Sequence, residues 1–260
     1  MGRLMEGRSG LVTGAASGIG RACAIRLARE GAAVIVADLP GAAAGARETI
    51  DQIEADGGRA EYFACDVSSA DDNEALVAHA VQRYGRLDFA HNNAGIGVHR
   101  LLHETSDEDF DRVIAVNLRG TFLGLKHEIR AMLGNEPPNR GAIVNTSSNA
   151  GLRAVTMLSA YAASKHGILG LTKNAAVEYA DDGIRVNAVC PGAIMTPLMS
   201  DQPPDRQAEI LAPQAMTRFG DPAEVAAAVV WLCSDESSFV TGVALPVDAG
   251  SVAWVSAHRQ

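Results

Sequence analysis

Short apolar runs alternate with longer amphipathic runs over most of the chain. The apolar runs predict strands, and they cover residues 10–12, 33–37, 60–64, 87–91, 142–146, 184–189 and 242–247. Between them, apolar residues recur at helical spacing, which predicts helices over residues 21–30, 42–56, 70–84, 106–132, 160–180 and 223–233. Near-continuously apolar strands that alternate with helices are typical of a parallel sheet covered on both faces. We therefore expect an α/β fold with a doubly wound parallel sheet.

This alternation continues through the 260 residues without a linker, an internal repeat or a low-complexity segment. It predicts one domain over residues 1–260. Segment 196–218 is the exception, because it contains a Pro-rich polar stretch and has no single period. A loop of that length in a compact domain is usually functional. We expect residues 196–218 to form a lid over the substrate.

A glycine-rich stretch follows the first predicted strand. Its sequence is Thr13-Gly14-Ala15-Ala16-Ser17-Gly18-Ile19-Gly20, and the second strand ends in Asp38. Strand, glycine-rich turn, helix, strand and acid, in that order, form the dinucleotide-binding unit of Rossmann-type folds. Gly14 permits a tight turn, Gly18 lets the backbone approach a pyrophosphate, and Gly20 lets the helix pack close to the strand. The stretch therefore predicts a dinucleotide cofactor.

Asp38 also indicates which cofactor is used. A carboxylate at this position can accept hydrogen bonds from the ribose hydroxyls of adenosine and would repel a 2′-phosphate. Leu39 and Pro40 follow it and Ser17 is uncharged, so no neighbouring Arg or Lys is offered to a phosphate. We expect NAD rather than NADP. The alternative is that Asp38 only caps the next turn.

Tyr161 and Lys165 are a second candidate for chemistry, at the start of the predicted helix 160–180, with Ser159 as its expected N-cap. Residues four apart share one helix face. A nearby ammonium favours the phenolate form of a tyrosine, whose free pKa is about 10. Lowering that pKa by about 3 requires roughly 4 kcal/mol, so we expect a second positive charge, such as an oxidised nicotinamide. Taken alone, the pair also fits an ordinary helix surface.

Four motifs together resemble those of the short-chain dehydrogenase/reductase family, over essentially the whole chain. They are Thr13-Gly14-x-x-x-Gly18-Ile19-Gly20, Asn92-Asn93-Ala94-Gly95, Tyr161-x-x-x-Lys165 and Pro191-Gly192. Each motif is moderately specific, whereas their joint order and spacing is highly specific. The resemblance implies one Rossmann-type domain with a parallel sheet of about seven strands. It also implies NAD(P)-linked interconversion of an alcohol and a carbonyl.

The resemblance implies roles for individual residues as well. Tyr161 would be the general acid/base, and Lys165 would lower the Tyr161 pKa and bind the nicotinamide ribose. Ser148 would polarise the carbonyl, and Asn117 would help to hold a water in a proton relay. The positions implied for the cofactor are Gly14, Ser17, Gly18, Ile19, Gly20, Asp38, Asp66, Val67, Asn93, Gly95, Tyr161, Lys165, Pro191, Gly192, Ile194 and Thr196.

Two of these assignments have alternatives. Ser147 and Ser148 are adjacent at the end of a predicted strand and should face opposite ways, so the pattern does not choose between them. The spacing in the family, thirteen residues before Tyr161, chooses Ser148. Without the family, Asn117 is better interpreted as a buried amide that satisfies backbone groups.

Charge and cysteine usage exclude several classes of function. The formal net charge is −9 with no basic run, which argues against nucleic acid as a partner. No apolar stretch is long enough to span a bilayer, and residues 1–8 lack the apolar core of a signal peptide. The cysteines show no pairing pattern, so we expect reduced thiols and a cytoplasmic protein; they are Cys23, Cys65, Cys190 and Cys233.

A metal site is not expected. His99 and His103 are four apart and His91 lies nearby, but no Cys or acidic residue completes a ligand set at the usual spacing. We interpret the spaced pair as exposed loop histidines near the mouth of the substrate pocket.

The substrate is the least determined feature. The pocket lining is expected from Ile96, Val98, residues 149–154, Leu158 and segment 196–218, with Met195, Leu198 and Met199 as an adaptable apolar wall. Arg153 and Arg218 are candidates for a carboxylate clamp. We expect a neutral or partly apolar secondary alcohol or ketone. A sugar, a steroid, a diol and a β-hydroxyacyl thioester remain open.

The resemblance further implies a homotetramer packed through helices 106–132 and 160–180, with the tail around Trp254 reaching a neighbouring active site. The main expectation is an NAD-dependent oxidoreductase. A catalytically silent NAD-binding regulatory or structural protein of the same fold is the alternative, against which the complete Asn117, Ser148, Tyr161 and Lys165 set argues. A different Rossmann enzyme, such as a methyltransferase, would leave the Tyr–Lys pair unexplained.

Overall fold

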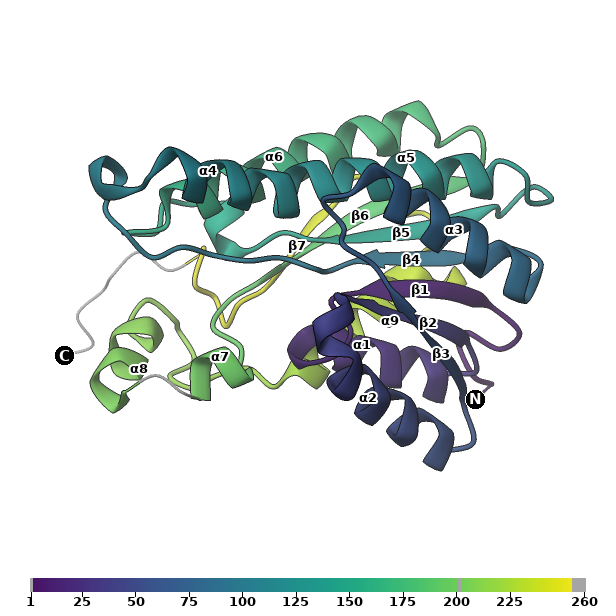
Figure 1. Cartoon of the computed structure of the whole chain (residues 1–260), viewed down its shortest axis with the longest axis horizontal. Coiled ribbons are helices and arrows are strands. Elements are labelled where there is room, and N and C mark those ends of the chain that lie inside the picture. The colour runs from purple at the N-terminus through teal and green to yellow at the C-terminus, as the bar shows by residue number, and fades with distance from the viewer. Residues whose placement is uncertain (1, 201–202, 254–260) are drawn as a thin grey trace.

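Seven parallel strands form one sheet in the computed structural model, which describes residues 2–200 and 203–253 (Figure 1). The strands are β1 (Ser9–Thr13), β2 (Ala33–Asp38), β3 (Arg59–Ala64), β4 (Phe89–Asn92), β5 (Gly141–Thr146), β6 (Ile184–Pro191) and β7 (Ala244–Val247). Their order in the sheet is β3-β2-β1-β4-β5-β6-β7, and every neighbouring pair is parallel. The predicted α/β doubly wound fold is therefore confirmed.

Helices cover both faces of this sheet (Figure 1). They are α1 (Gly18–Arg29), α2 (Ala43–Ala55), α3 (Ala70–Tyr84), α4 (Asp107–Val113), α5 (Gly120–Met132), α6 (Ser159–Glu178), α7 (Pro197–Ser200), α8 (Pro204–Leu211) and α9 (Pro222–Cys233). α1, α2 and α9 pack on one face, and α3, α5 and α6 pack on the other. No helix in the described part of the chain is long and apolar enough to cross a membrane.

Neighbouring residues of each central strand supply the two cores. On β1, Leu11 belongs to the core under α3, α5 and α6, whereas Val12 belongs to the core under α1 and α9. Ile143 and Val144 divide in the same way on β5. Successive side chains of a strand point to opposite faces, so a strand buried on both faces must be apolar at every position. This explains the continuous apolar runs in the sequence.

The direction of winding reverses between β1 and β4. From β1 the chain proceeds outward to β2 and β3, then crosses back so that β4 pairs with the other side of β1. At such a switch point the loops that leave the two strands diverge and open a crevice at the carboxyl edge of the sheet. The glycine-rich turn after β1 and the loop after β4 both lie at this edge (Figure 1).

The predicted helix 106–132 is continuous but not uniform. It contains α4, a π-helical segment over Ile114–Arg119, and α5. Ser106 caps the first turn, because its hydroxyl accepts the Asp109 amide at 3.1 Å. A π segment adds a residue to one turn and is frequent at functional sites. Hydrophobic periodicity did not reveal it, because one extra residue barely changes the apolar stripe.

Other boundaries differ in informative ways. α1 begins at Gly18, three residues earlier than predicted, so part of the glycine-rich stretch is its first turn. Ser159 is not an N-cap: it is the first residue of α6, and Leu158 holds the cap position without a side-chain bond. Segment 196–218 contains the short helices α7 and α8 rather than loop alone.

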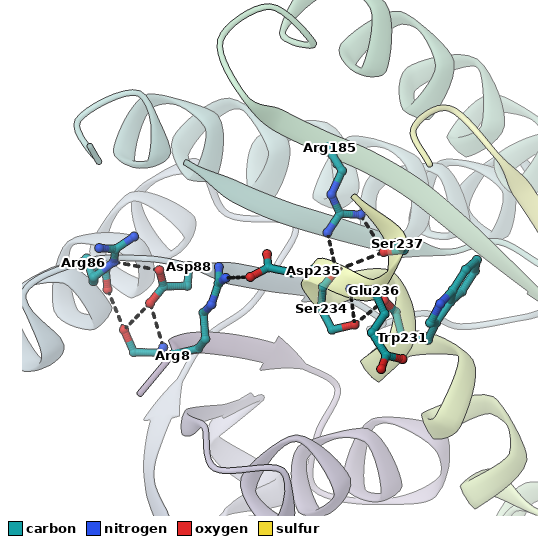
Figure 2. Close-up of polar contacts among 10 residues, drawn as sticks. Arg8, Arg86, Asp88, Arg185, Trp231, Ser234, Asp235, Glu236 and Ser237 are labelled. Carbon is teal, nitrogen blue, oxygen red and sulfur yellow. Dashed lines mark hydrogen bonds and ion pairs between the residues drawn. The ribbon is translucent and has the colours of Figure 1, made fainter. Parts of the chain in front are cut away.

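Charged groups at the amino edge of the sheet contact carboxylates, backbone carbonyls and hydroxyls (Figure 2). Arg8 contacts Asp235 at 2.7 Å, and Arg86 contacts the buried Asp88 at 2.7 Å. Arg185 on β6 donates to the carbonyls of Leu232 and Ser234 at 2.8 and 2.9 Å. It also donates to the hydroxyl of Ser237 at 2.9 Å. These contacts fix the start of the sheet to the segment after α9.

Candidate active site

The glycine-rich turn lies at the carboxyl edge, between β1 and α1. Gly14 and Gly18 have φ angles of 64° and 54°, in the left-handed region that favours glycine. A Cβ on Gly14 would lie 2.9 Å from the Cα of Ala94, and one on Gly20 would collide with the Gly14 carbonyl. The first amides of α1 have no partner within the helix, so this N-terminus favours an anion. The turn fits a pyrophosphate.

Two other cofactor candidates flank the turn. Ser17 is exposed, and its side chain makes no capping hydrogen bond, so its hydroxyl is not committed to the helix end. Ile19 is partly buried and packs against the core under α1 and α9. Thr196 lies across the turn, because a Cβ on Gly18 would be 3.3 Å from its methyl carbon. The start of segment 196–218 therefore meets the predicted pyrophosphate site.

Asn93 ties the loop after β4 to this turn. Its side-chain amide donates to the carbonyls of Thr13 and Gly14 at 3.1 and 3.3 Å. The Thr13 hydroxyl accepts in return from the amides of Asn93 and Ala94, at 3.0 and 3.1 Å. The Asn93 side chain thus shapes the turn. Gly95 lies further in, where a Cβ would be 3.3 Å from Lys165 Nζ.

Asp38 ends β2 beside the turn and is half-buried. Its carboxylate accepts from the amide of Ala16 at 2.9 Å and from that of Leu39 at 2.8 Å. The structure also brings Arg21 to this turn, which no local sequence signal indicated. Arg21 donates to the Ala16 carbonyl and pairs with Glu48 at 2.9 Å. Its charge is therefore matched within the protein.

Asp66 and Val67 follow β3 on the same edge. Asp66 accepts from the amide and the hydroxyl of Ser68 at 2.9 and 2.7 Å. Val67 is buried against α5, where a Cβ on Gly120 would lie 3.0 Å from it. Both residues are on the β2–β3 side of the switch point, the side on which the adenosine end of a dinucleotide is expected.

Tyr161 and Lys165 lie one turn apart on α6, with Lys165 Nζ 5.4 Å from the centre of the Tyr161 ring. Lys165 is 2 % exposed, and its Nζ donates to the Thr146 carbonyl at 2.8 Å. Burial lowers the pKa of Lys165 to about 8. Burial also raises the pKa of Tyr161, and a hydrogen bond with Ser148 opposes that rise. The expected lowering of the Tyr161 pKa by Lys165 is therefore not produced by the chain alone, because loss of water dominates.

Ser147 and Ser148 do face different ways. Ser147 donates to the Lys165 carbonyl at 2.8 Å and so serves the backbone of α6. Ser148 hydrogen-bonds with Tyr161, and its hydroxyl accepts from the amide of Ala150 at 3.1 Å. The choice of Ser148 by family spacing agrees with this geometry.

Asn117 lies in the π segment and is fully buried. Its Oδ1 accepts from the Ile96 amide at 2.8 Å, and its Nδ2 donates to the Ile96 carbonyl and the Ser164 hydroxyl at 2.9 and 3.0 Å. Both hydrogens of the amide are therefore used. The observed contacts match a buried amide that satisfies backbone groups, and they hold the loop after β4 against α6. A role in a water relay stays a prediction.

The end of β6 closes the site from the other side. Gly192 follows Pro191 and passes so close to Asp248 that a Cβ would lie 2.7 Å from the Asp248 Cα. Ile194 is buried in the core and pairs with Gly220 in an isolated bridge. Ile194 therefore anchors the start of segment 196–218 instead of lining an open surface.

The histidines do not form a metal site. Within the described residues, no group of three or more His, Cys, Asp or Glu side chains could hold a metal ion. His99 is an exposed loop residue, as expected, and contacts Arg206 on α8; His103 is exposed but lies in a 3-10 turn over Leu102–Glu104. His91, in contrast, is fully buried in β4, where burial lowers its pKa to about 3. Its Nε2 is 2.8 Å from the Thr146 hydroxyl.

Sequence reasoning assigned no role to two threonines that support the site. Thr146 presents its carbonyl to Lys165, and its hydroxyl links His91 to Asn93 at 2.8 and 3.3 Å. Thr13 organises the loop after β4. Thr146 is the last residue of β5, directly before Ser147 and Ser148, and Thr13 is the last residue of β1, at the start of the glycine-rich stretch; this position was the available signal.

Comparison with known proteins bears on the whole chain. A family model described as enoyl-(acyl carrier protein) reductase matches residues 14–251. A cyclohexanol dehydrogenase of Acinetobacter sp. (strain SE19) is 43% identical over 249 residues, which cover 95% of this chain and 96% of that protein. A 2,5-dichloro-2,5-cyclohexadiene-1,4-diol dehydrogenase of Sphingobium indicum is 42% identical over 253 residues, covering 96% and 98%.

Solved structures agree with this likeness. A crystal structure of a levodione reductase superposes with a TM-score of 0.89 at 37% identity, covering 96% of this chain and all of that one. A dehydrogenase/reductase of Sinorhizobium meliloti 1021 gives 0.89 at 35% identity, covering 95% of each chain. Together with the motifs and the sheet order, these matches show that the chain belongs to the short-chain dehydrogenase/reductase family, whose oxidoreductases use a nicotinamide cofactor, NAD or NADP.

Proposed function

We propose that the protein is an NAD-dependent oxidoreductase that interconverts a neutral, cyclic secondary alcohol and its ketone, with Tyr161 as general acid/base. The observation that carries the proposal is the convergence of Ser148, Tyr161 and Lys165 beside the glycine-rich turn. Two separate elements, the turn after β5 and helix α6, supply these three groups, and nothing in their structural roles alone requires a tyrosine hydroxyl and a serine hydroxyl to meet.

The residues divide the chemistry between them. A bound nicotinamide supplies the hydride transfer and, when oxidised, a positive charge. Tyr161 takes the hydroxyl proton during oxidation and returns it during reduction. Ser148 donates to the substrate oxygen as negative charge develops there. Lys165, which is buried and held by the Thr146 carbonyl, keeps an ammonium one turn from the phenol. Asn117 positions the loop that faces them.

NAD is favoured over NADP by the surroundings of Asp38. Its carboxylate is half-buried and fixed by two backbone amides, so it cannot swing away from a ribose bound there. Arg21 reaches the same turn through the Ala16 carbonyl, and its charge is paired with Glu48 at 2.9 Å. A 2′-phosphate would therefore meet an anion without a free cation to balance it.

A neutral substrate is favoured by the ion pairs of two arginines beside the site, Arg218 and Arg206. Arg218 forms two contacts with Glu224, at 2.7 and 2.8 Å, and Arg206 pairs with Glu209 at 2.6 Å. Arg153 donates to Ser251. Met195 and Leu152, both partly exposed, offer apolar surface at the edge of the site. The named substrates of two relatives, cyclohexanol and a chlorinated cyclohexadienediol, have neutral rings.

Segment 196–218 is proposed as the lid over this substrate. It begins at Thr196 against the glycine-rich turn, and its helix α8 contacts the loop after β4 through Arg206 and His99. Closure of such a segment would exclude water from the reacting groups.

We further propose that residues 1–260 form one domain.

We also propose a homotetramer in the cytoplasm. Phe110, Phe122 and Val177 on α4, α5 and α6 are 45%, 49% and 82% exposed, which is unusual for large apolar side chains on adjoining helices. The four cysteines are buried and unpaired, as expected in a reducing compartment. Light scattering of the purified protein tests the assembly. The expected contribution of Trp254 to a neighbouring site lies outside the described residues.

Turnover of cyclohexanol with NAD⁺ tests the proposed function. Absorbance at the wavelength of the reduced nicotinamide is followed for the purified protein, and the reverse reaction uses cyclohexanone and NADH. NADP⁺ and NADPH are run in parallel, and other alcohols, diols, steroids and hydroxyacyl thioesters extend the panel. Turnover with NAD⁺ supports the proposal. NADH binding without turnover of any alcohol would favour the catalytically silent alternative, and better turnover with NADP⁺ would overturn the interpretation of Asp38.

A further inference from the structure

The turn after β7 meets three parts of the active site. Its backbone bends sharply, since Asp248 accepts from the amides of Gly250 and Val252 at 3.0 and 2.8 Å. Ala249 has a φ of 54°, an uncommon conformation for a residue with a side chain. The Ala249 carbonyl accepts from the amide of Ala215, near the end of segment 196–218. A strained turn persists only where its surroundings hold it in place.

Ser251 is the polar centre of this turn. It is 2 % exposed, and its hydroxyl oxygen accepts from Asn149 Nδ2 at 3.1 Å and from Arg153 Nη2 at 2.9 Å. The two donors come from the short turn after β5, about a hundred residues earlier in the chain. Ser251 therefore fixes that turn from behind, and the arginine charge strengthens its hold.

Asn149 carries the contact onward to Ser148. The Ser148 hydroxyl donates to Asn149 Oδ1 at 3.2 Å, while its oxygen accepts from the Ala150 amide at 3.1 Å. The amide of Asn149 thus bridges two hydroxyls, Ser148 in front and Ser251 behind. A single hydroxyl hydrogen rotates freely unless an acceptor fixes its direction. The Tyr161 oxygen and Asn149 Oδ1 are the two acceptors beside the single Ser148 hydrogen, and the bond to Asn149 fixes its direction while no substrate is bound.

We propose that Ser251 is a positioning residue for catalysis, acting through Asn149 on the direction of the Ser148 hydroxyl. The inference rests on the proposed function, in which Ser148 donates to the substrate oxygen. At 3.2 Å the bond to Asn149 is long enough for the hydroxyl to exchange it for a substrate oxygen. Because Ser251 accepts from the Asn149 amide and is itself held by Arg153, Asn149 stays in place when the Ser148 hydroxyl turns.

A double-mutant cycle on kcat tests this coupling, with cyclohexanol and NAD⁺ as the probe reaction. Ser251→Ala is expected to lower kcat about 3- to 10-fold, the size of one net hydrogen bond, with the KM for NAD⁺ unchanged. Asn149→Ala is expected to lower kcat by a similar factor. Adding Ser251→Ala to the Asn149→Ala variant should then change kcat by less than about 2-fold, because the intermediary is already gone.

Ser237→Ala is the matched control. Ser237 is also buried, at 1% exposure, and it also accepts a hydrogen bond from an arginine, Arg185, but at the amino edge of the sheet (Figure 2). The Ser237→Ala substitution should lower the melting temperature and leave kcat unchanged. If Ser237→Ala lowers kcat as much as Ser251→Ala, or if Ser251→Ala has the same effect in both backgrounds, the coupling does not exist.

Crystal structures of the wild type and of Ser251→Ala provide a readout independent of turnover. The proposal predicts that the Asn149 side chain leaves Ser148 in the variant. An unchanged Ser148–Asn149 contact would overturn it even if the protein proves inactive on every alcohol. Inactivity of the wild type, in contrast, would count against the proposed function and leave this structural outcome to decide the positioning role.

Discussion

The two edges of the same parallel sheet are built from different chemistry. At the amino edge, Arg8 and Arg86 meet carboxylates at 2.7 Å, and Arg185 is spread over backbone carbonyls (Figure 2). A cavity of about 450 Å³ opens beside them. Its wall includes Arg83, which Glu61 neutralises at 2.7 Å. This edge is rich in charge, yet most of the charges are already matched.

At the carboxyl edge, the groups around Tyr161 are held mainly by amides, hydroxyls and close-packed glycines rather than by ion pairs. Lys165 is buried there with a carbonyl rather than a carboxylate as its described partner. Ser148 and Tyr161 hydrogen-bond to each other and keep capacity for a third group. Paired groups contribute stability, whereas groups whose hydrogen-bonding capacity is unfilled can bind and react. The comparison therefore predicts that changes at the two edges affect different measurements.

The largest effect is expected at the carboxyl edge. Tyr161→Phe should lower kcat about 10²- to 10⁴-fold, because the general acid/base is removed. NADH affinity and the free energy of unfolding should change little, since the ring is kept. Steady-state kinetics measure kcat, a fluorescence titration measures NADH affinity, and urea denaturation measures the free energy of unfolding. Turnover within 10-fold of the wild type would remove Tyr161 from the mechanism.

The amino edge should respond in the opposite way. Arg185→Met is expected to lower the free energy of unfolding by about 2–4 kcal/mol, because buried carbonyls lose their donor. kcat should stay within about 2-fold. Urea denaturation and steady-state kinetics give the two numbers. Arg47→Met is the control: Arg47 is 64% exposed and pairs with Asp51 on the surface, so about 0.5 kcal/mol is expected.

A buried carboxyl just below the carboxyl edge sharpens the comparison. Glu128 is fully buried and accepts from Asn92 at 2.9 Å, and burial raises the pKa of Glu128 to about 8. In the folded protein Glu128 therefore keeps its proton up to about pH 8, whereas in the unfolded chain it releases that proton near pH 4.5. Stability from this group is complete below pH 4.5 and is lost as pH rises toward 8.

Glu128→Gln removes that loss, because an amide does not titrate. Between pH 6 and pH 8, the free energy of unfolding of the wild type should fall by about 2–3 kcal/mol more than that of the variant. Urea denaturation at the two pH values measures this difference. Glu108→Gln, at an exposed position, should leave the pH dependence unchanged. Equal pH dependence of the wild type and Glu128→Gln would show that Glu128 is already ionised at pH 6.

The smallest expected effect concerns the choice of cofactor. Asp38→Asn should raise kcat/KM for NADP⁺ relative to NAD⁺ about 10- to 100-fold, because the charge that repels a 2′-phosphate is removed while the shape is kept. Kinetics with both cofactors measure the ratio. Glu48→Gln frees Arg21 instead, and it should shift the ratio in the same direction if Arg21 can reach the phosphate. An unchanged ratio in Asp38→Asn would place the discrimination elsewhere.

Much of the fold was predictable because its signals are local. A strand buried on both faces is continuously apolar, and an amphipathic helix repeats every 3.6 residues, so the order of the elements follows from short windows of sequence. The glycine positions 14 and 18 were predictable for the same reason, since a positive φ angle strongly favours one residue type. The π segment and the start of α6 were missed, because one residue more or less per turn leaves the apolar pattern almost intact.

The sequence by itself determined the sheet architecture, the glycine-rich turn and the Tyr161–Lys165 spacing, because each depends on residues that are close in the chain. The strand pattern left Ser147 and Ser148 open, and the spacing of the family chose Ser148. Only the tertiary structure decided that burial raises rather than lowers the Tyr161 pKa, and that Arg21 reaches the turn beside Asp38. It also decided that Asn149, which accepts from Ser148, meets Ser251 across a sequence separation of 102 residues. Such contacts depend on distances and desolvation, which arise only when remote segments pack together.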